Sequence, residues 1–335
     1  MSERSCPACG AGERDERGLK NGLRVGACRG CGTLYARGGA GGEADASCDY
    51  DAYYHEANLS VPPFIERRLD EIVGGFAPFR RTGRLLDIGC GAGTLLHAAR
   101  RAGWDAAGTE VSRPAVEHVR GEGFEVFAGE LQQARFPDGH FDVVTASEIL
   151  EHLPDPRVLL AEAARILRPG GLFWGTTPHG RGLSARALGI GWSTVSPPEH
   201  LQLFSLGGVR RLLKSAGFTR ARVITQGFNH YEVRHALLAR RRARGGDKGA
   251  AADGANTNGD ATVKHDDASS TTAVKHDEGA AVKHEEGAAF DRVQSAYRLN
   301  ETLMSSRAGR LTKAALNGVL SAARLGDSIK IWAIR

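Results

Sequence analysis

Residues 84–93 read Arg-Leu-Leu-Asp-Ile-Gly-Cys-Gly-Ala-Gly, and this stretch decides the fold. Its first five residues are mostly apolar and predict a short buried strand, while residues 94–102 predict a helix. The glycines between them let the backbone turn sharply and approach a ligand without Cβ clashes. The helix that follows would offer unpaired N–H groups to that ligand. Strand, glycine turn and helix together indicate a ligand-binding site at the edge of an α/β sheet.

The residues around this turn distinguish between possible ligands. Thr94 stands where a dinucleotide-binding turn would carry its last glycine, which argues against a dinucleotide. Asp87 closes the strand, and a carboxylate there would repel a phosphate but suits a ligand with an ammonium and a sulfonium. Glu110, 21 residues after Gly89, is expected at the end of the next strand, where a carboxylate can accept two ribose hydroxyls. These residues favour S-adenosylmethionine (SAM).

Strand and helix patterns alternate from residue 83 to about residue 230. The expected strands are residues 104–110, 124–128, 141–147, 172–177 and 221–225, and the expected helices are residues 113–122, 156–166 and 206–216. Residues 328–334 alternate between apolar and polar side chains as a strand does, and we expect them to be the last strand of the sheet. This alternation predicts an α/β fold with a parallel, doubly wound sheet and helices on both faces.

Five stretches resemble, in order, the signatures of class I SAM-dependent methyltransferases of the type 11 and type 23 kind. They are residues 87–93, 108–112, 141–144, 148–153 and 167–171. The resemblance covers about residues 83–230 and implies a Rossmann-like, seven-stranded sheet. It also implies that residues 329–334 form an antiparallel strand. The implied activity is transfer of a methyl group from SAM.

The resemblance assigns cofactor contacts residue by residue. It places Asp87, Gly89 and Gly91 at the amino-acid end of SAM, with Cys90 and Gly93 in the same loop. Glu110 would bind the ribose, Val111 would lie near the adenine, and Glu130 or Leu131 would meet the adenine edge. Ser147 and Glu148 would line the methionine side. Tyr53 and Tyr54 either close over SAM or pack against the sheet. Cys90 is expected to fill space and not to act as a nucleophile, because no basic partner is visible in the sequence.

Two histidines are candidates for acid–base chemistry. Residues 196–201, Ser-Pro-Pro-Glu-His-Leu, follow the fifth strand and are expected to lie over the carboxyl edge of the sheet. His200 could take a proton from an attacking hydroxyl or amine, or else His200 and Glu199 only fix the geometry of the loop. His152 either faces the substrate or caps the turn before Pro154. We expect an acceptor oxygen or nitrogen on a small molecule or a sugar.

Four of the six cysteines form two pairs near the N-terminus. Cys6-x-x-Cys9 and Cys28-x-x-Cys31 are separated by 18 residues, a spacing that fits a tetrahedral zinc site. The segment resembles a zinc ribbon, and we expect a structural Zn²⁺ because all four ligand positions are filled by cysteine. The alternative is four unmetallated thiols in a disordered arm.

The chain is expected to have three parts. Residues 1–37 form the cysteine module, residues 38–82 form a connector with a helix over the SAM site, and residues 83–335 form the catalytic domain. Within that domain, residues 244–288 repeat Val-Lys-His followed by two acidic residues and cannot bury an apolar face. We expect a disordered insertion there, followed by a helical cap at about residues 290–325.

Composition leaves the partner open. The net charge of +5 and pI near 9.0 permit a nucleic-acid partner without arguing for one, because acidic and basic residues are well mixed. An RNA or protein methyltransferase that binds its substrate through the cysteine module is therefore an alternative, and a catalytically silent SAM-binding module is another. No apolar run reaches the roughly 20 residues of a membrane span, and no signal core is visible, so a cytoplasmic location is expected. Nothing in the sequence indicates an oligomeric state.

Overall fold

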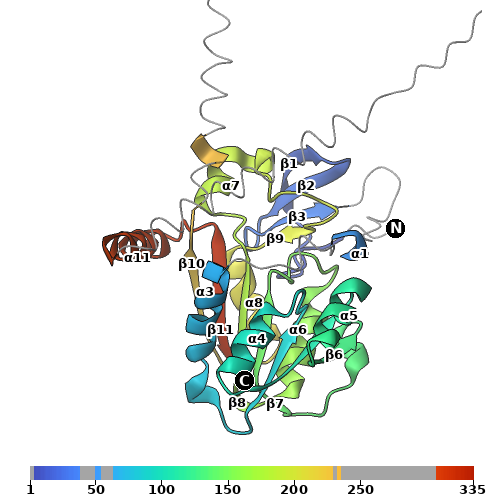
Figure 1. The fold of residues 1–335 in the computed structure, drawn as a ribbon. Coiled ribbons are helices and arrows are strands. Elements are labelled where there is room, and N and C mark those ends of the chain that lie inside the picture. Colours follow the sequence, from blue (N-terminus) through green and yellow to red (C-terminus); the bar gives the residue numbers. More distant parts are fainter. Residues whose placement is uncertain (1–3, 38–49, 54–62, 229–231, 235–306) are drawn as a thin grey trace, which may run out of the picture. The chain divides into compact units, whose positions relative to one another are not determined.

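The computed structural model describes residues 4–37, 50–53, 63–228, 232–234 and 307–335 (Figure 1). The chain divides into two compact units, one of residues 1–229 with 313–335 and one of residues 230–312. The second unit contributes only residues 232–234 and the start of helix α11 (Arg307–Ala322) to the described part. The repeat tract at 244–288 and the first half of the expected cap lie outside the described residues.

A seven-stranded sheet forms the centre of the first unit. Its order is β10-β11-β8-β7-β4-β5-β6. The strands are β4 (Arg84–Ile88), β5 (Asp105–Glu110), β6 (Glu125–Ala128), β7 (Phe141–Ser147), β8 (Leu167–Pro178), β10 (Arg220–Gln226) and β11 (Ser328–Ile334). Strand β11 runs antiparallel to both of its neighbours, whereas β4 to β8 pair in parallel. The expected fold class and the antiparallel last strand are confirmed.

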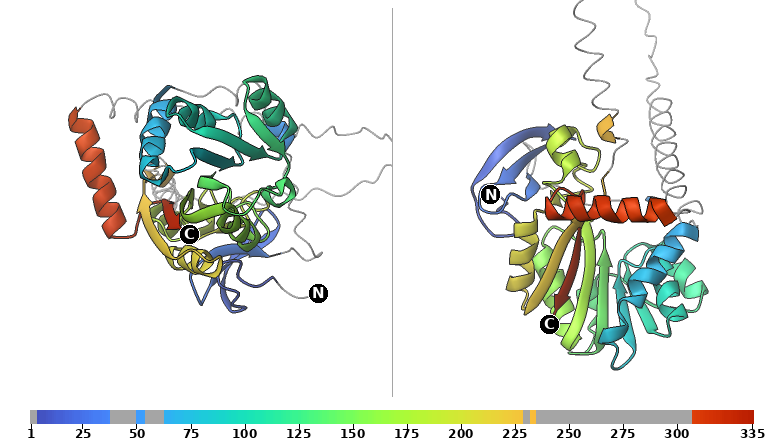
Figure 2. Two further views of the ribbon diagram at one scale, coloured as in Figure 1. Left: turned by 90° about the horizontal axis from the view of Figure 1, so that it is seen from below. Right: turned by 90° about the vertical axis from the view of Figure 1, so that its left-hand side faces the viewer.

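Helices cover both faces of this sheet (Figure 2). They are α3 (Pro63–Gly74), α4 (Thr94–Arg101), α5 (Arg113–Gly121), α6 (Pro156–Ile166) and α8 (Leu206–Ser215). Leu85 and Val143 pack in one core with α3 and α4, whereas their neighbours Leu86 and Val144 pack in another core with α6 and α8. Successive side chains of a strand point to opposite faces, so these continuous apolar strands fill two cores at once.

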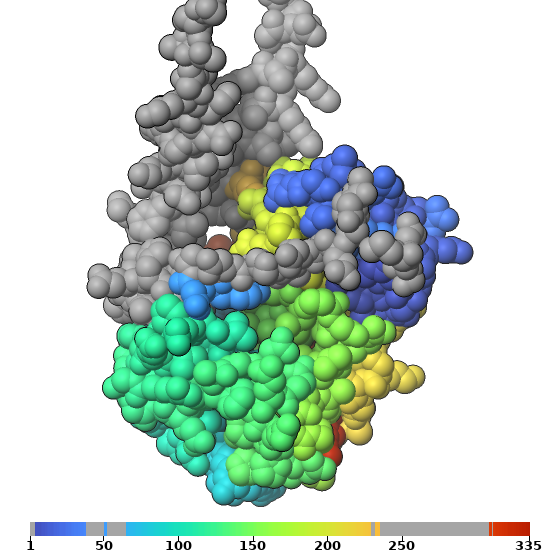
Figure 3. All heavy atoms as spheres, turned by 90° about the vertical axis from the view of Figure 1, so that its right-hand side faces the viewer, coloured from blue at the N-terminus to red at the C-terminus, as the bar shows by residue number. Residues whose placement is uncertain are grey.

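The cysteine module forms a second, antiparallel sheet of β1 (Arg14–Lys20), β2 (Leu23–Cys28) and β3 (Leu34–Arg37). A fourth strand, β9 (Gln202–Leu203), joins it from the part of the chain that forms the seven-stranded sheet. Cys6 and Cys28 share a core with Phe204 of that part. The space-filling view shows the blue N-terminal residues directly against green residues of the same unit (Figure 3). The module is therefore built into the same compact unit as the seven-stranded sheet.

Strand β8 differs from the expectation, which started it at residue 172 after a loop. It begins at Leu167, directly after α6, because Leu167 already pairs with Phe141 of β7. The register shifts between Phe141 and Val143, so the Pro-Gly-Gly residues at 169–171 are the irregular start of a strand. Helix α7 (Leu183–Leu188), η1 (Ala77–Phe79), η2 (Leu131–Ala134) and η3 (Gly189–Gly191) were not expected. Each is too short to carry a periodic pattern.

A buried carboxylate joins strands at the end of the sheet opposite the glycine turn. Asp142 of β7 accepts the backbone N–H groups of residues 81, 82 and 83 at 2.7–2.8 Å, and Arg168 Nε at 2.6 Å. Burial alone would raise the pKa of Asp142, but these hydrogen bonds outweigh it and lower the pKa. The carboxylate therefore fixes the entry into β4. No helix in the described part of the chain is long and apolar enough to cross a membrane.

Candidate active site

The glycine turn after β4 requires glycine for steric reasons. Gly89, Gly91 and Gly93 have φ values of 63°, 51° and 73°, in the left-handed region that other residues avoid. A Cβ at Gly89 would collide with Ile149 Cδ1, and one at Gly93 would lie 3.0 Å from Val119 Cγ2. Helix α4 begins without a side-chain cap, so its first N–H groups can bind a ligand.

Glu110, at the end of β5, holds this turn in place. Its carboxylate accepts the backbone N–H groups of Gly91 at 2.9 Å, Val111 at 2.8 Å and Ser112 at 2.9 Å. A carboxylate has about four acceptor positions, so about one remains for a ribose hydroxyl. The contact between Glu110 and a ribose stays a prediction, and the structure adds a loop-fixing role that sequence reasoning missed.

Asp87 is the second buried carboxylate of this region. It is 5% exposed and accepts a hydrogen bond from Thr145 Oγ1 at 2.6 Å. Burial and the nearby charge of Glu110 raise its pKa to about 7, against the opposing effect of the Thr145 hydrogen bond. Among the residues that the structure describes, neither Asp87 nor Glu110 has an ion-pair partner. Two buried acidic groups call for a cationic ligand, which SAM is, and the half-exposed Val111 offers an apolar surface for its base.

The other predicted cofactor contacts are placed as follows. Ser147 and Glu148 are exposed where β7 ends, and Ser147 Oγ lies 2.8 Å from Thr176 Oγ1. Glu130 is exposed and caps η2 together with Gln133. The Leu131 side chain belongs to the core, so only its backbone could meet an adenine edge. These contacts stay predictions.

Cys90 is buried beneath the turn. A Cβ at Gly108 of β5 would lie 2.7 Å from its Sγ, so the thiol fills the space between loop and strand. Burial raises the pKa of the Cys90 thiol, which keeps it protonated and unreactive.

His152 and His200 lie together near the end of β7, with ring centroids 4.7 Å apart. His152 Nδ1 lies 2.9 Å from the carbonyl oxygen of Glu199, and His200 Nδ1 lies 2.7 Å from that of Thr194. Because carbonyls only accept, each Nδ1 must be the donor, so a neutral His200 carries its lone pair on Nε2. The His152 ring is also hydrogen-bonded to the backbone of Glu148. Burial and the neighbouring His200 lower the pKa of His152. Of the two rings, His200 is therefore the better placed to accept a proton through Nε2.

The side chain of Glu199 is exposed and contacts Ser196 Oγ at 3.3 Å within its own loop. Its backbone carbonyl, and not its carboxylate, is what His152 contacts. This arrangement supports the loop-geometry alternative for Glu199, and its catalytic role stays a prediction.

Glu151 is a functional candidate that sequence reasoning missed. Its side chain is fully buried, with Oε2 accepting Thr177 Oγ1 at 2.9 Å and Oε1 without a hydrogen-bond partner. Burial and the charge of Glu148 raise its pKa well above the ordinary value. Ligand atoms of Glu151, His152 and His200 lie within 4.8 Å of one another, so these three could hold a metal ion. The available signal was an acidic residue next to a histidine between the apolar residues of the run Ile-Leu-Glu-His-Leu.

The connector reaches the site through α1 (Tyr50–Tyr53). The Tyr50 ring stands edge-on to His152 at a centroid distance of 6.2 Å, and Asp51 Oδ1 accepts the N–H of Arg113 at 2.8 Å, at the start of α5. Tyr54 lies outside the described residues, and Tyr53 is described only as the last residue of α1. The expectation of aromatic cover named Tyr53 and Tyr54 and missed Tyr50.

Comparisons with known proteins agree with this site. Residues 61–223 match a family described as "Methyltransferase domain". A ubiquinone biosynthesis O-methyltransferase of Methylococcus capsulatus is 39% identical over 114 residues, 32% of this chain and 48% of that protein. One from Idiomarina loihiensis is 28% identical over 48% of this chain and 69% of that protein. A 27-O-demethylrifamycin SV methyltransferase of Amycolatopsis mediterranei is 36% identical over 31% of this chain and 42% of that protein.

The chain spans about half the length of the curated relatives that it matches first. The matched residues carry the glycine turn, Asp87, Glu110 and the histidine pair, together with strands β4 to β8 of the seven-stranded sheet. Residues 61–223 therefore form a methyltransferase domain of the class I SAM-dependent family.

Proposed function

We propose that this chain transfers a methyl group from SAM to a hydroxyl oxygen of a small-molecule acceptor, with His200 as the general base. The observation that carries the proposal is the His152–His200 pair, in which a backbone carbonyl binds His200 Nδ1 and so leaves the lone pair of a neutral ring on Nε2. The pair adjoins the cofactor loop, because Ile149 packs against Gly89. A nitrogen acceptor or a sugar hydroxyl would use the same arrangement.

The chemistry needed from the protein is limited. When bound, SAM supplies an electrophilic methyl group on a sulfonium. Asp87 and Glu110 would favour the cationic ligand, and the free N–H groups of α4 would bind its carboxylate. His200 Nε2 would accept the acceptor's hydroxyl proton, while the Nδ1–H bond to the carbonyl of Thr194 fixes the tautomer. His152, neutral and adjacent, would not repel the charge that His200 gains.

The relatives support the acceptor class. Those named above are two ubiquinone biosynthesis O-methyltransferases and a 27-O-demethylrifamycin SV methyltransferase. Their names describe methyl transfer to oxygen in the synthesis of small molecules. The Tyr50 ring that stands edge-on to His152 suits a flat, apolar acceptor.

The test is His200→Ala, assayed with tritiated SAM against a panel of phenols, alcohols and sugars. Loss of a general base should lower kcat by about 10²- to 10⁴-fold, with the SAM Kd unchanged. His140→Ala is the matched control, because His140 precedes β7 at the opposite end of the sheet. Unchanged turnover in His200→Ala would remove it from the mechanism. Methyl transfer only to RNA or protein fractions would favour a macromolecular substrate, and SAM binding without any transfer would indicate a silent module.

We also propose that the cysteine cluster holds a structural Zn²⁺. Cys6 Sγ lies 3.6 Å from Cys31 Sγ, and Cys9 Sγ lies 3.5 Å from Cys28 Sγ. Four sulfurs at about 2.3 Å from one tetrahedral ion would stand about 3.8 Å apart, so the cluster fits zinc with little movement. One zinc per chain by elemental analysis of the purified protein supports the proposal. A metal-free protein with unchanged unfolding would contradict it.

A further inference from the structure

The strand that follows His200 lies between the cysteine module and the turn that carries His152. On one side, β9 pairs with β3, and Ala36 N–H donates to the Leu201 carbonyl at 2.8 Å. On the other side, Leu201 N–H donates to the Glu151 carbonyl at 2.9 Å. Leu201, the residue after His200, is thus hydrogen-bonded to the module through its C=O. Through its N–H it is hydrogen-bonded to Glu151, the residue before His152.

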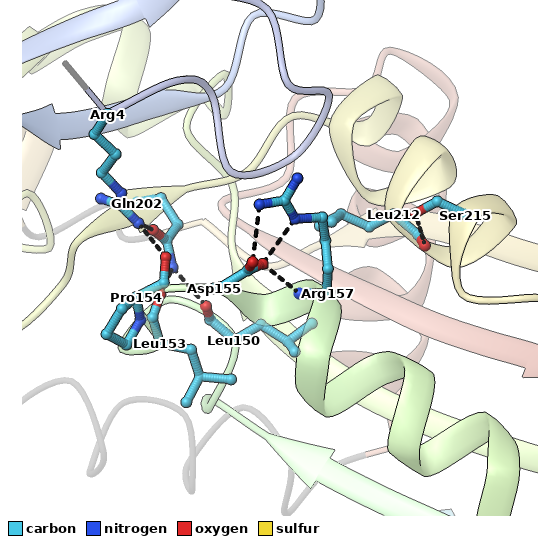
Figure 4. A network of polar contacts seen from close by, with 9 residues as sticks. All are labelled: Arg4, Leu150, Leu153, Pro154, Asp155, Arg157, Gln202, Leu212 and Ser215. Atoms are coloured by element: carbon cyan, nitrogen blue, oxygen red, sulfur yellow. Dashed lines mark hydrogen bonds and ion pairs between the residues drawn. The ribbon is translucent and has the colours of Figure 1, made fainter. Parts of the chain in front are cut away.

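Gln202 extends this connection through its side chain. It is 1% exposed, and its Nε2 donates to the carbonyls of Leu150 and Leu153, at 2.7 Å each. Its Oε1 accepts a hydrogen bond from Arg4 at 2.6 Å (Figure 4). Both N–H donors of the Gln202 amide bind the turn that carries His152, and its Oε1 accepts a hydrogen bond from the module. Leu150 and Leu153 bracket Glu151 and His152, so the amide sets the shape of that turn.

Arg4 completes the connection from the module. Besides Gln202, it donates to the carbonyl of Pro154 at 2.8 Å and to that of Ala36 in β3 at 3.1 Å. One guanidinium therefore contacts β3, the end of the His152 turn and the Gln202 amide. Figure 4 draws the contacts of Arg4 with Pro154 and Gln202. The planar fork of arginine suits three acceptors at once, which a lysine could not reproduce.

Two more contacts hold the ends of the same segment. Asn21 Nδ2 donates to the carbonyl of Pro197 at 2.9 Å, and Ser205 Oγ donates to the carbonyl of Cys31 at 2.5 Å. His200 lies between these two anchors, and both come from the cysteine module. The module is thus bonded to the segment before, next to and after the histidine.

We propose that the cysteine module is a positioning element of the active site, and that Arg4 and Gln202 are positioning residues that set His200 against His152. The inference rests on the proposed function in one respect, namely that this histidine pair serves the acceptor. A displacement of about 1 Å in a reacting group can cost about a hundredfold in rate, so loss of this connection should appear in turnover. The SAM loop contacts neither Arg4 nor Gln202, so cofactor binding should be spared.

The test uses Arg4→Ala and Gln202→Glu in the full chain. Gln202→Glu keeps an oxygen for Arg4 but replaces both N–H donors to the turn, whereas Arg4→Ala removes the module side only. We expect kcat to fall about 10- to 100-fold with the SAM Kd within about twofold of wild type. Hydrogen exchange should accelerate in both residues 148–154 and residues 196–203. Arg17→Ala is the matched control, an exposed arginine of β1 in the same module.

Four outcomes decide the proposal. Arg4→Lys should recover part of the turnover lost in Arg4→Ala, because a lysine can still reach one acceptor. A purely local stabilising role would not predict this order of turnover among wild type, Arg4→Lys and Arg4→Ala. If both variants fold and kcat and exchange stay at the wild-type level, the proposal is overturned. If Gln202→Glu fails to fold, Arg4→Ala and Asn21→Ala carry the same test. If the wild type binds SAM but transfers no methyl group, the proposed function fails, and the exchange measurement still decides whether the module holds the two segments.

Discussion

Asp87 should lose a proton when SAM binds. Burial and the charge of Glu110 raise its pKa to about 7 in the free protein. A cation beside it would stabilise the ionised form and lower the pKa. At pH 6.5, a group with a pKa of about 7 is about three-quarters protonated, and full ionisation in the SAM complex would release all of that bound proton. SAM binding at pH 6.5 should therefore release about 0.7 protons.

The proton count can be measured by titration calorimetry. SAM is titrated into the protein at pH 6.5 in two buffers with different ionisation enthalpies, and the slope of observed enthalpy against buffer enthalpy gives the protons released. The release should fall to about 0.1 at pH 8, where Asp87 is already ionised. Below pH 7, the affinity should weaken by up to about tenfold per pH unit, because the proton must leave first. Asp87→Asn should abolish the release, and Glu117→Gln, an exposed carboxylate of α5, should not change it.

Two results would refute the reasoning. Saturating SAM binding with no proton release at pH 6.5 would show that Asp87 is ionised in the free protein or does not sense the ligand. Equal release in wild type and Asp87→Asn would assign the proton to another group.

Three further predictions concern the other buried groups. Glu110→Gln should weaken SAM binding by about 10- to 100-fold in calorimetry, because the amide replaces one charged acceptor of the turn by a donor. An unchanged Kd for SAM would count against the loop-fixing role of Glu110. Asp142→Asn should lower the free energy of unfolding by about 3 kcal/mol in urea at pH 7. The pKa of Asp142 is lowered, so this stability is present above the unfolded value of 3.8 and is lost as the pH falls through the folded value. The difference between wild type and variant should therefore shrink once the pH falls below 3.8. Cys9→Ser should reduce both zinc content and melting temperature, and full zinc content in that variant would exclude Cys9 as a ligand.

The sheet and the cofactor turn could be predicted because their determinants are local. The strand, the glycines and the helix after Asp87 are contiguous, and the apolar strands show their buried faces in the sequence. Glu110 is found from its distance to the turn. Its three backbone donors were not visible, because they depend on how residues 91 and 110–112 meet in space.

The pairing of β9 with β3 could not be predicted, because its determinants are far apart in the sequence. Strand β9 has two residues, and its partner lies more than 160 positions earlier in the chain. A two-residue strand has no periodicity to detect, and nothing local marks its partner. For the same reason, sequence reasoning treated His152 and His200 separately and could not see that each Nδ1 is held by a backbone carbonyl.

The two halves of the site are therefore encoded differently. The cofactor half uses one continuous loop and one carboxylate from the neighbouring strand, so it can form wherever this sheet forms. The proposed acceptor half needs α1, the turn after β7, the segment around His200 and the cysteine module to meet. Those elements come from residues 4–37, 50–53, 148–154 and 194–205, and they are joined by hydrogen bonds, by the pairing of β3 with β9 and by shared apolar cores. It follows that substitutions in the module should change how the acceptor is handled while leaving SAM binding intact, and that changes in the glycine turn should do the reverse.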